Sequence, residues 1–378
     1  MKILTTSHYI ADFTVPLQAK HSIERTKFPE LGRFWSPAMA VAAYLPGQAY
    51  DLAHFINKIP LSFRKPWVVT FESALPRMFP PQGPLRELLR NQLSRSNCVA
   101  IIPMSLWALT NFKRVNAGWA GMEKVFEKTQ ILHPALKVHS LVPRRLQPGE
   151  VIQVVFIGNC FARKGGIVAL RLAKKAIAEG IPVHIHIVSS QMIYSGTHTD
   201  HPDPTHYAAD LRNMHLPNVT FHGALNNQEV LNLMSKCHVN LLATLHDTYG
   251  FSVLEGFSNG LPVISSDVCA LPEFVFPGPG LNSNGFLLKL PKQEDDRWRY
   301  VDETHSSEYW EMLDESFESM ADQALLHLQG LAAAPERLEQ LSRAAIDGVA
   351  ERHNPARLAE VLDTLYRQDD RRDLAVAS

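Results

Sequence analysis

Long apolar runs are absent from this sequence of 378 residues, and none reaches the roughly 18 apolar residues that a membrane-spanning helix needs. A signal-peptide pattern is also absent, because Met1-Lys2 passes directly into Ile3-Leu4. We therefore expect a cytoplasmic protein. The length is sufficient for two domains of ordinary size.

Cysteine pairs and common hydrolase motifs are missing as well. The four cysteines lie far apart without a C-x-x-C pair, so neither a zinc site nor a disulfide framework is indicated, and each is expected to be a small buried residue: Cys98, Cys160, Cys237 and Cys269. The sequence contains no G-x-S-x-G elbow and no H-E-x-x-H motif. These absences exclude the commonest hydrolase mechanisms.

Histidines offer possible metal ligands in one segment, residues 198–206, which carries His198, His201 and His206. Its two prolines and its lack of apolar residues fit a surface loop better than a metal site. His184 and His186 fall on one face of an expected strand and are interpreted as interior or edge residues with local partners. We expect no metal and no cofactor.

Net charge is close to zero, but the two parts of the chain differ in sign. Residues 1–149 hold 19 Lys and Arg against 8 Asp and Glu, and residues 150–378 hold 18 against 30, with a dense acidic stretch at 292–322. A basic half favours an anionic partner such as a lipid phosphate, an anionic membrane surface or an acidic glycan. A solvated charged surface is the alternative. Nucleic acid is not indicated, because no nucleic-acid-binding motif occurs.

Alternating strand and helix patterns predict an α/β protein with parallel sheets. In the first half, strands are expected at 2–7, 66–71 and 98–103, a short apolar element at 51–56, a small helix or strand edge at 38–49, and helices at 84–95 and 106–112. In the second half, strands are expected at 151–157, 183–188, 219–223, 239–242, 262–265 and 285–288, with helices at 167–179, 227–236 and 335–368.

The best domain boundary is the proline-bearing and glycine-bearing stretch at 143–149. We therefore expect one Rossmann-like domain over 1–149 and a second over 150–354. The last helical pattern breaks at Asn354-Pro355, and the helix from about 355 to 378 is expected to join the first domain.

Two positive charges follow the strongest predicted strand, in the loop Gly158–Gly166. The loop lacks the G-x-G-x-x-G and P-loop spacings, but Arg163 and Lys164 precede its glycine pair. Arginine binds phosphate in a bidentate manner and lysine acts as a point charge, so a diphosphate is the expected ligand. A solvated turn is the alternative.

The stretch from His246 to Glu255 holds two acids, Asp247 and Glu255, with Gly250 between them, and reads as strand, polar loop and helix start. A helix N-terminus at the carboxyl end of a parallel strand presents unpaired N–H groups to an anion, while carboxylates suit hydroxyls. Either acid can instead cap the helix. The apolar neighbours of Glu255 predict a buried carboxylate that needs hydroxyl partners.

Together, Val154–Gly166, the Phe221-His222-Gly223 turn and Asp247–Glu255 resemble the donor-binding domain of retaining GT-B glycosyltransferases of the "glycosyl transferases group 1" family, also called family 4. The central feature is the family's E-x7-E motif, here Asp247 to Glu255. The resemblance covers roughly 150–275. It implies two Rossmann-like domains facing a cleft, with the C-terminal helix crossing back to the N-terminal acceptor-binding domain.

The resemblance also implies roles. Glu255 would hold the ribose hydroxyls of the nucleotide, and Asp247 would contact the transferred sugar and stabilise developing positive charge. Arg163 and Lys164 would neutralise the diphosphate, and Leu225 would lie against the base. Backbone amides facing the sugar or the phosphates would come from Gly250, Phe251, Ser252 and Val253.

Three departures from the family pattern stand out. Asp247 is one methylene shorter than the usual glutamate. Glu72 follows the 67–71 strand, where many members have a histidine, and we list it with Asp247 as a candidate catalytic residue, a turn cap being the alternative. Ser7-His8-Tyr9-Ile10 replaces the double-glycine loop that often follows the first strand.

The implied activity is metal-independent transfer of a sugar from a nucleotide-diphosphate sugar, UDP or GDP favoured, to an acceptor hydroxyl with retention of configuration. Surface glycan or glycolipid assembly, with a glycan or lipid-linked acceptor and peripheral association with the inner face of an anionic membrane, is the expected setting. The alternatives are a non-hydrolysing sugar-nucleotide 2-epimerase and a catalytically silent nucleotide-sugar-binding protein.

Overall fold

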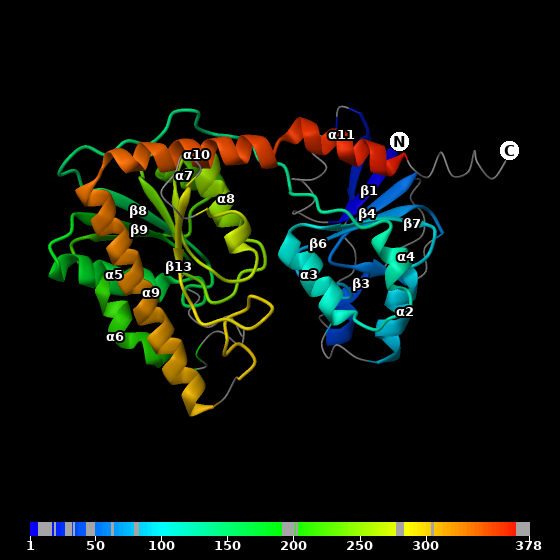
Figure 1. The fold of residues 1–378 in the computed structure, drawn as a ribbon, viewed down its shortest axis with the longest axis horizontal. Helices are drawn as coiled ribbons and strands as arrows, with labels where there is room; N and C mark the ends of the chain where they lie inside the picture. The colour runs from blue at the N-terminus through cyan, green and yellow to red at the C-terminus, as the bar shows by residue number, and fades with distance from the viewer. Residues whose placement is uncertain are drawn as a thin grey trace. The chain divides into compact units, whose positions relative to one another are not determined.

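The chain folds into two compact α/β units, described here from a computed structural model (Figure 1). The first unit comprises Met1–Leu136 with His353–Ser378, and the second comprises Lys137–Arg352. The structure describes residues 1–6, 17–18, 20–26, 32, 35–42, 50–61, 64–78, 83–190, 201, 203–276, 283–303 and 306–367. No helix within these ranges is both long and apolar enough to cross a membrane.

The N-terminal unit is built on a parallel five-stranded sheet of order β2-β1-β4-β6-β7. Its strands are β1 (Lys2–Thr6), β2 (Ser22–Thr26), β4 (Leu52–Ile56), β6 (Trp67–Phe71) and β7 (Cys98–Pro103). A small pair is formed by β3 (Val41–Ala42), which follows the 3-10 helix η4 (Ser36–Ala40), and β5 (Ile59–Pro60). The described α-helices before Leu136 are α2 (Pro84–Leu93), α3 (Leu106–Val115) and α4 (Met122–Phe126).

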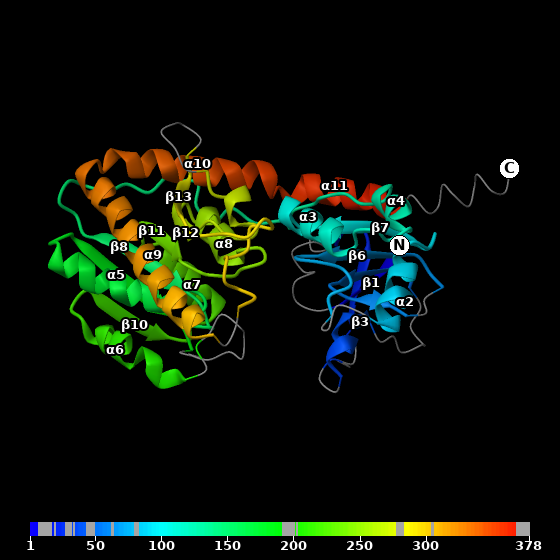
Figure 2. The same ribbon diagram turned by 60° about the horizontal axis from the view of Figure 1, so that its bottom comes forward.

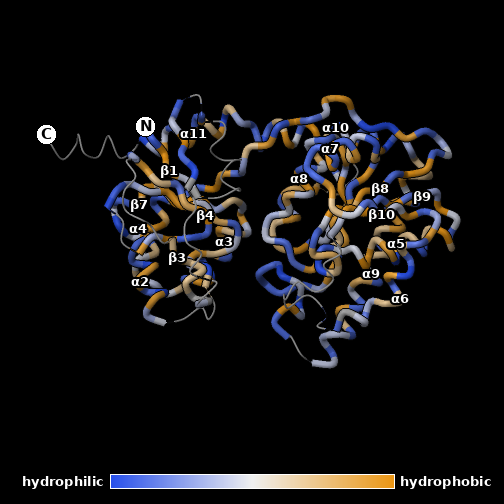
Figure 3. Tube along the Cα trace, turned by 180° about the vertical axis from the view of Figure 1, so that it is seen from behind, coloured by the Kyte–Doolittle hydropathy of each residue, from blue (hydrophilic) through white to orange (hydrophobic). Residues whose placement is uncertain are grey.

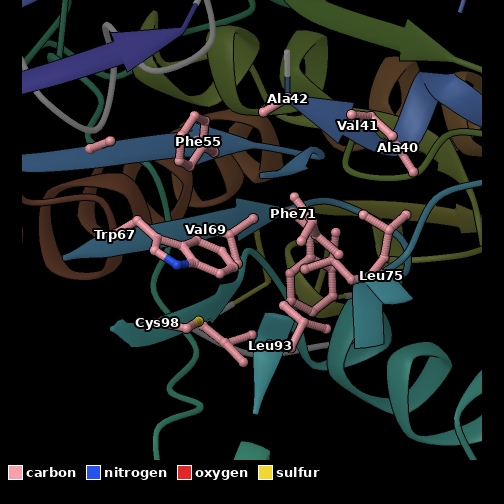
Figure 4. Close-up of a cluster of buried hydrophobic side chains, with 14 of the residues drawn as sticks. Ala40, Val41, Ala42, Phe55, Trp67, Val69, Phe71, Leu75, Leu93 and Cys98 are labelled. Atoms are coloured by element: carbon pink, nitrogen blue, oxygen red, sulfur yellow. The ribbon is translucent and has the colours of Figure 1, made fainter. Parts of the chain in front are cut away.

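Aromatic side chains from neighbouring strands fill the core of this unit (Figure 4). Phe55 on β4 meets Trp67 on β6 edge to face, with ring centroids 6.0 Å apart, and Phe71 lies 5.3 Å from Phe112 of α3. Strands buried on both faces read as continuous apolar runs. This is why the sequence pattern identified β6 and β7 correctly.

The C-terminal helix α11 (Pro355–Tyr366) belongs to the N-terminal unit, so its predicted return is confirmed. Asn354 caps it by accepting from the amides of Ala356 and Arg357. The Tyr366 hydroxyl lies 2.7 Å from His54 Nδ1 of β4, and Asp363 lies 2.9 Å from His21. Buried polar pairs therefore fix this helix against the first sheet.

The C-terminal unit contains a parallel six-stranded sheet of order β10-β9-β8-β11-β12-β13. The strands are β8 (Ile152–Ile157), β9 (Val183–Val188), β10 (Val219–Gly223), β11 (Val239–Leu242), β12 (Val263–Ser266) and β13 (Gly285–Leu288). The longer helices are α5 (Gly166–Ala178), α7 (Asn227–Met234), α8 (Phe251–Ser258), α9 (Ser307–Ala333) and α10 (Glu336–Arg352). Shorter ones are η5 (Pro204–Tyr207), α6 (Ala208–Leu211), η6 (Arg212–His215) and η7 (Leu271–Glu273).

Helices cover the second sheet on both faces, with α5 beside α9 on one of them (Figure 2). Hydrophobic residues concentrate along the strands between these helices, and the outer turns are more hydrophilic (Figure 3). The 27-residue helix α9 was not predicted. Its acids pair with α5, because Arg171 contacts Asp314 and Lys175 contacts Glu318. Part of the acidic stretch is thus paired with cations of α5.

Two smaller expectations need comment. Three of the four cysteines are buried as expected, but Cys160 is half-buried in the loop after β8. His184 and His186 have the predicted local partners, because His184 Nε2 lies 2.8 Å from Thr220 Oγ1 and His186 Nδ1 lies 3.0 Å from His222 Nε2.

The structure describes only part of the histidine tract at 198–206, because residues 198–200 and 202 lie outside the described residues. His206, within it, lies 2.9 Å from Asp314. No cluster of His, Cys, Asp or Glu that suits a metal ion occurs in the described ranges.

Burial of two histidines predicts acid sensitivity. Burial lowers the pKa of His54 to about 3, and burial together with the neighbouring His184 and His222 lowers that of His186 to about 4. An unfolded histidine titrates near 6.5, so over the interval below that pH the unfolded chain binds more protons and stability falls with falling pH. Each group contributes a slope of at most about 1.4 kcal/mol per pH unit.

The check is urea unfolding between about pH 7 and about pH 5, where the free energy of unfolding should decrease. A His186→Gln variant should show a shallower slope. A free energy that does not change over this interval would contradict the burial of these rings as neutral groups.

Candidate functional site

The centre of the C-terminal sheet is a topological switch point. From β8 the chain adds β9 and β10 on one side, and then β11, β12 and β13 on the other. Ligands of open α/β sheets bind outside the carboxyl ends of the two strands where the order reverses. In this unit those ends carry the loop 158–165 after β8 and the loop 243–250 after β11. Both loops were selected from the sequence.

Close packing between these loops depends on a glycine pair at the start of α5. Gly165 has φ +100°, and a Cβ there would lie 2.3 Å from the carbonyl oxygen of Ala243. A Cβ on Gly166 would lie 2.5 Å from the Phe161 ring. Only glycine allows the first loop to approach the end of β11 this closely.

An ion pair joins the two loops directly. Lys164 Nζ contacts Asp247 Oδ2, and both side chains are largely buried. The other carboxylate oxygen, Oδ1, accepts hydrogen bonds from the amides of Gly250 at 2.9 Å and Tyr249 at 3.3 Å. Burial acts to raise the pKa of Asp247, but Lys164 and these two amides outweigh it and hold the pKa below its usual value. Asp247 is therefore a carboxylate at neutral pH.

Arg163 lies at the same end of the sheet. Its Nη1 donates to the carbonyl of His246 at 3.1 Å, and its own carbonyl accepts from Thr244 Oγ1 at 2.8 Å. Its Nε is buried and has no hydrogen-bond partner in the described part of the chain. A buried donor without a partner is unfavourable, so this guanidinium retains capacity for an acceptor atom of a ligand.

The helix α8 begins at this loop with Gly250 as its N-cap, at φ +82°. A Cβ on Gly250 would lie 2.4 Å from Leu271 Cδ2, so glycine is required here too. Of the four amides expected to face a ligand, two are engaged internally: that of Gly250 by Asp247, and that of Val253 by the Gly250 carbonyl at 2.9 Å. The Ser252 amide has no partner among the residues that the structure describes.

Glu255 lies on the outer face of α8 with Phe251 and Ser252, one turn away. These three are half-buried, whereas the remaining helix residues are buried. Positions i, i+3 and i+4 share one helix face, so Glu255 is on the face that carries the start of the helix. The expectation that Glu255 is deeply buried was wrong. Part of the Glu255 residue therefore borders solvent.

The other candidates lie elsewhere. Leu225 is half-buried just after β10, at the carboxyl end of the same sheet. Glu72 belongs to the N-terminal unit, where Arg77 Nη1 donates to its Oε1 at 2.8 Å. Ser7-His8-Tyr9-Ile10 lies outside the described residues.

Sequence reasoning missed two polar residues that shape the site. Thr244 Oγ1 links the loops through the Arg163 carbonyl, and Asn240 Nδ2 of β11 donates to the Ser252 carbonyl at 2.7 Å. Gly256 allows that contact, because a Cβ there would lie 2.7 Å from Asn240 Nδ2. The available signal was one polar residue within an otherwise apolar strand, and another two positions after its end.

Two parallel Rossmann-like sheets, with a C-terminal helix returned to the N-terminal unit, define the GT-B fold. Solved structures with this fold are similar over nearly their whole length. Sucrose-phosphate synthase from Thermosynechococcus elongatus matches at 16% identity over 100% of both chains with a TM-score of 0.62. HepE from Anabaena, solved with UDP and glucose, matches at 14% identity over 97% of this chain and 99% of that chain with a TM-score of 0.58.

A glycosyltransferase from Rickettsia africae matches at 10% identity over 97% and 98% of the two chains, with a TM-score of 0.62. At these identities the similarity shows the fold. No curated protein matches the sequence.

The sequence itself assigns the family of the C-terminal domain. Residues 152–297 match the family "Glycosyl transferases group 1". Residues 152–297 of this chain therefore form a glycosyl transferases group 1 domain within a GT-B fold. The matched residues include both loops at the switch point.

The glycine requirement gives a test with an internal control. Gly165→Ala should lower the free energy of unfolding by about 2 kcal/mol or more, because the new Cβ meets backbone atoms and φ is positive. Gly180→Ala, at the other end of α5 with φ +66° and nothing within 4 Å, should lower it by only about 1 kcal/mol. Urea unfolding compares the two, and equal losses would argue against close contact between the loops.

Proposed function

We propose that the switch point of the C-terminal unit holds a nucleotide-diphosphate sugar, and that the protein transfers this sugar to an acceptor hydroxyl with retention of configuration. The observation that carries the proposal is the contact between Lys164 and Asp247. It brings a cation suited to phosphate and an anion suited to sugar hydroxyls to one point, beside the N-terminus of α8, whose N-cap Gly250 has no side chain.

The diphosphate would bind to Lys164, Arg163 and the Ser252 amide. When the sugar bond breaks, negative charge grows on the leaving diphosphate, and fixed cations stabilise that charge without rearrangement. Lys164 contacts Asp247 Oδ2 in the structure. A phosphate would compete for this ammonium group and release one carboxylate oxygen toward the sugar.

Asp247 would bind hydroxyls of the transferred sugar and stabilise the positive charge that develops on the ring. Its lowered pKa keeps the group ionised for this task. Its hydrogen bonds from Gly250 and Tyr249 fix the orientation of the carboxylate. In retaining front-face transfer, an oxygen of the departing diphosphate accepts the proton of the acceptor hydroxyl, so no covalent enzyme intermediate is needed.

The nucleoside would lie toward Glu255 and Leu225. Glu255 is accessible on the face of α8 that carries the helix start, which suits a carboxylate that accepts hydrogen bonds from ribose hydroxyls. Leu225 follows β10 at the same sheet edge and would contact the base. UDP and GDP are the favoured nucleotides.

For the acceptor we propose a glycan or lipid-linked sugar, as in surface glycan or glycolipid assembly. The support is the charge of residues 1–149, 19 Lys and Arg against 8 Asp and Glu. Peripheral attachment to the inner face of an anionic membrane would follow from the same charge. Glu72 is the candidate contact for the acceptor or the sugar in this unit.

Separate effects on binding and transfer test the site. Asp247→Asn should bind the nucleoside diphosphate at least as tightly as the wild type, because Lys164 is no longer paired with a carboxylate, while the transfer rate falls by about a hundredfold or more. Lys164→Gln and Arg163→Gln should instead weaken nucleotide binding by about tenfold or more. Lys174→Gln, an exposed position on α5, is the control and should change neither.

Isothermal titration with UDP, GDP, ADP and dTDP identifies the base, and transfer or donor hydrolysis is then measured with the matching sugars. Full activity of an Arg163→Ala, Glu255→Ala double variant would refute the site. Solvent hydrogen exchange at sugar C2 without an acceptor would indicate the epimerase instead, and tight binding without turnover on any acceptor would indicate a silent binding protein.

A further inference from the structure

A second polar cluster lies in the N-terminal unit, at the carboxyl ends of β4 and β6. It consists of Asn57, Glu72 and Arg77. Arg77 Nη1 donates to Glu72 Oε1 at 2.8 Å, and Asn57 Nδ2 donates to the same oxygen at 3.3 Å. In return, Asn57 Oδ1 accepts from the Glu72 amide at 3.2 Å. The Glu72 side chain is therefore fixed from two sides.

The second oxygen of Glu72 is available. Among the described residues, no group donates to Oε2, and the side chain is 17% exposed. A fixed carboxylate with one unused oxygen at a sheet edge can accept a hydrogen bond from a ligand hydroxyl.

Arg77 brings unused donors to the same place. Only its Nη1 is engaged in the described part of the chain, and its side chain is 39% exposed. Nε and Nη2 can therefore donate to an anionic group, in the bidentate geometry that arginine forms with phosphate or carboxylate. The Glu72 carboxylate, which can accept a hydrogen bond from a hydroxyl, thus lies beside the Arg77 guanidinium, which can bind an anion.

Two asparagines, one in α3 and one directly after it, hold the loop that carries Glu72 and Arg77. Asn111 Nδ2 donates to the Ser73 carbonyl at 3.1 Å, and the fully buried Asn116 Nδ2 donates to the Leu75 carbonyl at 2.8 Å. Arg90 Nε donates in turn to Asn116 Oδ1 at 2.8 Å.

Asn57 itself has φ +54°, a left-handed conformation that asparagine adopts more readily than most residues with a side chain. An ion pair as exposed as Glu72 with Arg77 contributes little to stability. That contribution does not account for the two amide side chains, Asn111 and Asn116, that hold the loop around it. Pre-organisation of a ligand site does account for them.

We propose that Glu72 and Arg77 form a two-point site for a carbohydrate bearing an anionic group, a phosphate or a carboxylate. Glu72 Oε2 accepts from a sugar hydroxyl, Arg77 binds the anionic group, and Asn57 is a positioning residue for Glu72. The role of this carbohydrate as the acceptor rests on the proposed function, whereas its binding does not.

The test measures binding to the full chain by ligand-observed NMR. The probes are hexose 1-phosphates, hexose 6-phosphates and hexuronates, each compared with its neutral hexose, and a hexose joined through a diphosphate to farnesol. At least one anionic probe should bind about tenfold or more tightly than its neutral counterpart. Preference for the farnesyl compound over the free phosphates would identify a lipid-linked source.

Variants assign the site. Arg77→Gln should remove the preference for the anionic probe, with a loss of about tenfold or more. Asn57→Gly keeps the positive φ but releases Glu72, so it should weaken anionic and neutral probes alike without a loss of thermal stability. Arg95→Gln, an exposed arginine at the amino end of β7, should bind as the wild type does.

Equal binding of anionic and neutral hexoses by the wild type would overturn the proposal, as would an unchanged preference in Arg77→Gln or no binding of any anionic probe. Titration with UDP and GDP runs in parallel. If the wild type binds neither UDP nor GDP, the proposed donor site is refuted. The site at Glu72 and Arg77 is unaffected by that result, because the two measurements use different ligands and different residues.

Discussion

The contact between Lys164 and Asp247 is the interaction on which the geometry of the C-terminal site depends. It links the loop after β8 to the loop after β11, and through Oδ1 it also fixes the amides of Gly250 and Tyr249 at the start of α8. The glycines at 165 and 250 permit the close approach that this contact requires. A buried ion pair is a weak source of stability, so its placement at a switch point is better explained by ligand binding.

Much of the fold could be predicted from the sequence, because parallel strands buried on both faces read as apolar runs. For this reason β6, β7 and β8 were placed within one residue of their observed bounds. Helix α9 was missed although Tyr309, Leu313 and Phe317 repeat at helical spacing, since the acids between them dominated the pattern. The site residues came from motifs, but the pairing of Lys164 with Asp247, 83 positions apart, is a product of tertiary packing. The half-exposure of Glu255 likewise depends on which face of α8 packs.

The two units place polar groups according to the same topological rule. In the C-terminal sheet the order reverses between β8 and β11, and in the N-terminal sheet it reverses between β1 and β4. Asn57 directly follows β4 and holds Glu72, which follows the next strand, β6. Besides its excess of lysine and arginine, the first unit thus has a fixed acid and a fixed arginine at the carboxyl ends of its strands. Ligands of open α/β sheets bind at this edge. Net positive charge attracts an anion, but only such fixed groups can select one.

Aspartate at 247, in place of the usual glutamate, suits the contacts that this position makes with Lys164 and with the amides of Tyr249 and Gly250. A short side chain can return to amides two and three residues ahead, and Oδ1 does so at Tyr249 and Gly250. A glutamate would carry its oxygens one methylene further and would lose this local capping. The shorter acid thus orders the start of α8 with one oxygen while the other remains with Lys164. In the proposed function, a diphosphate that draws Lys164 away would leave that second oxygen to the sugar, and one carboxylate would then couple phosphate binding to sugar recognition.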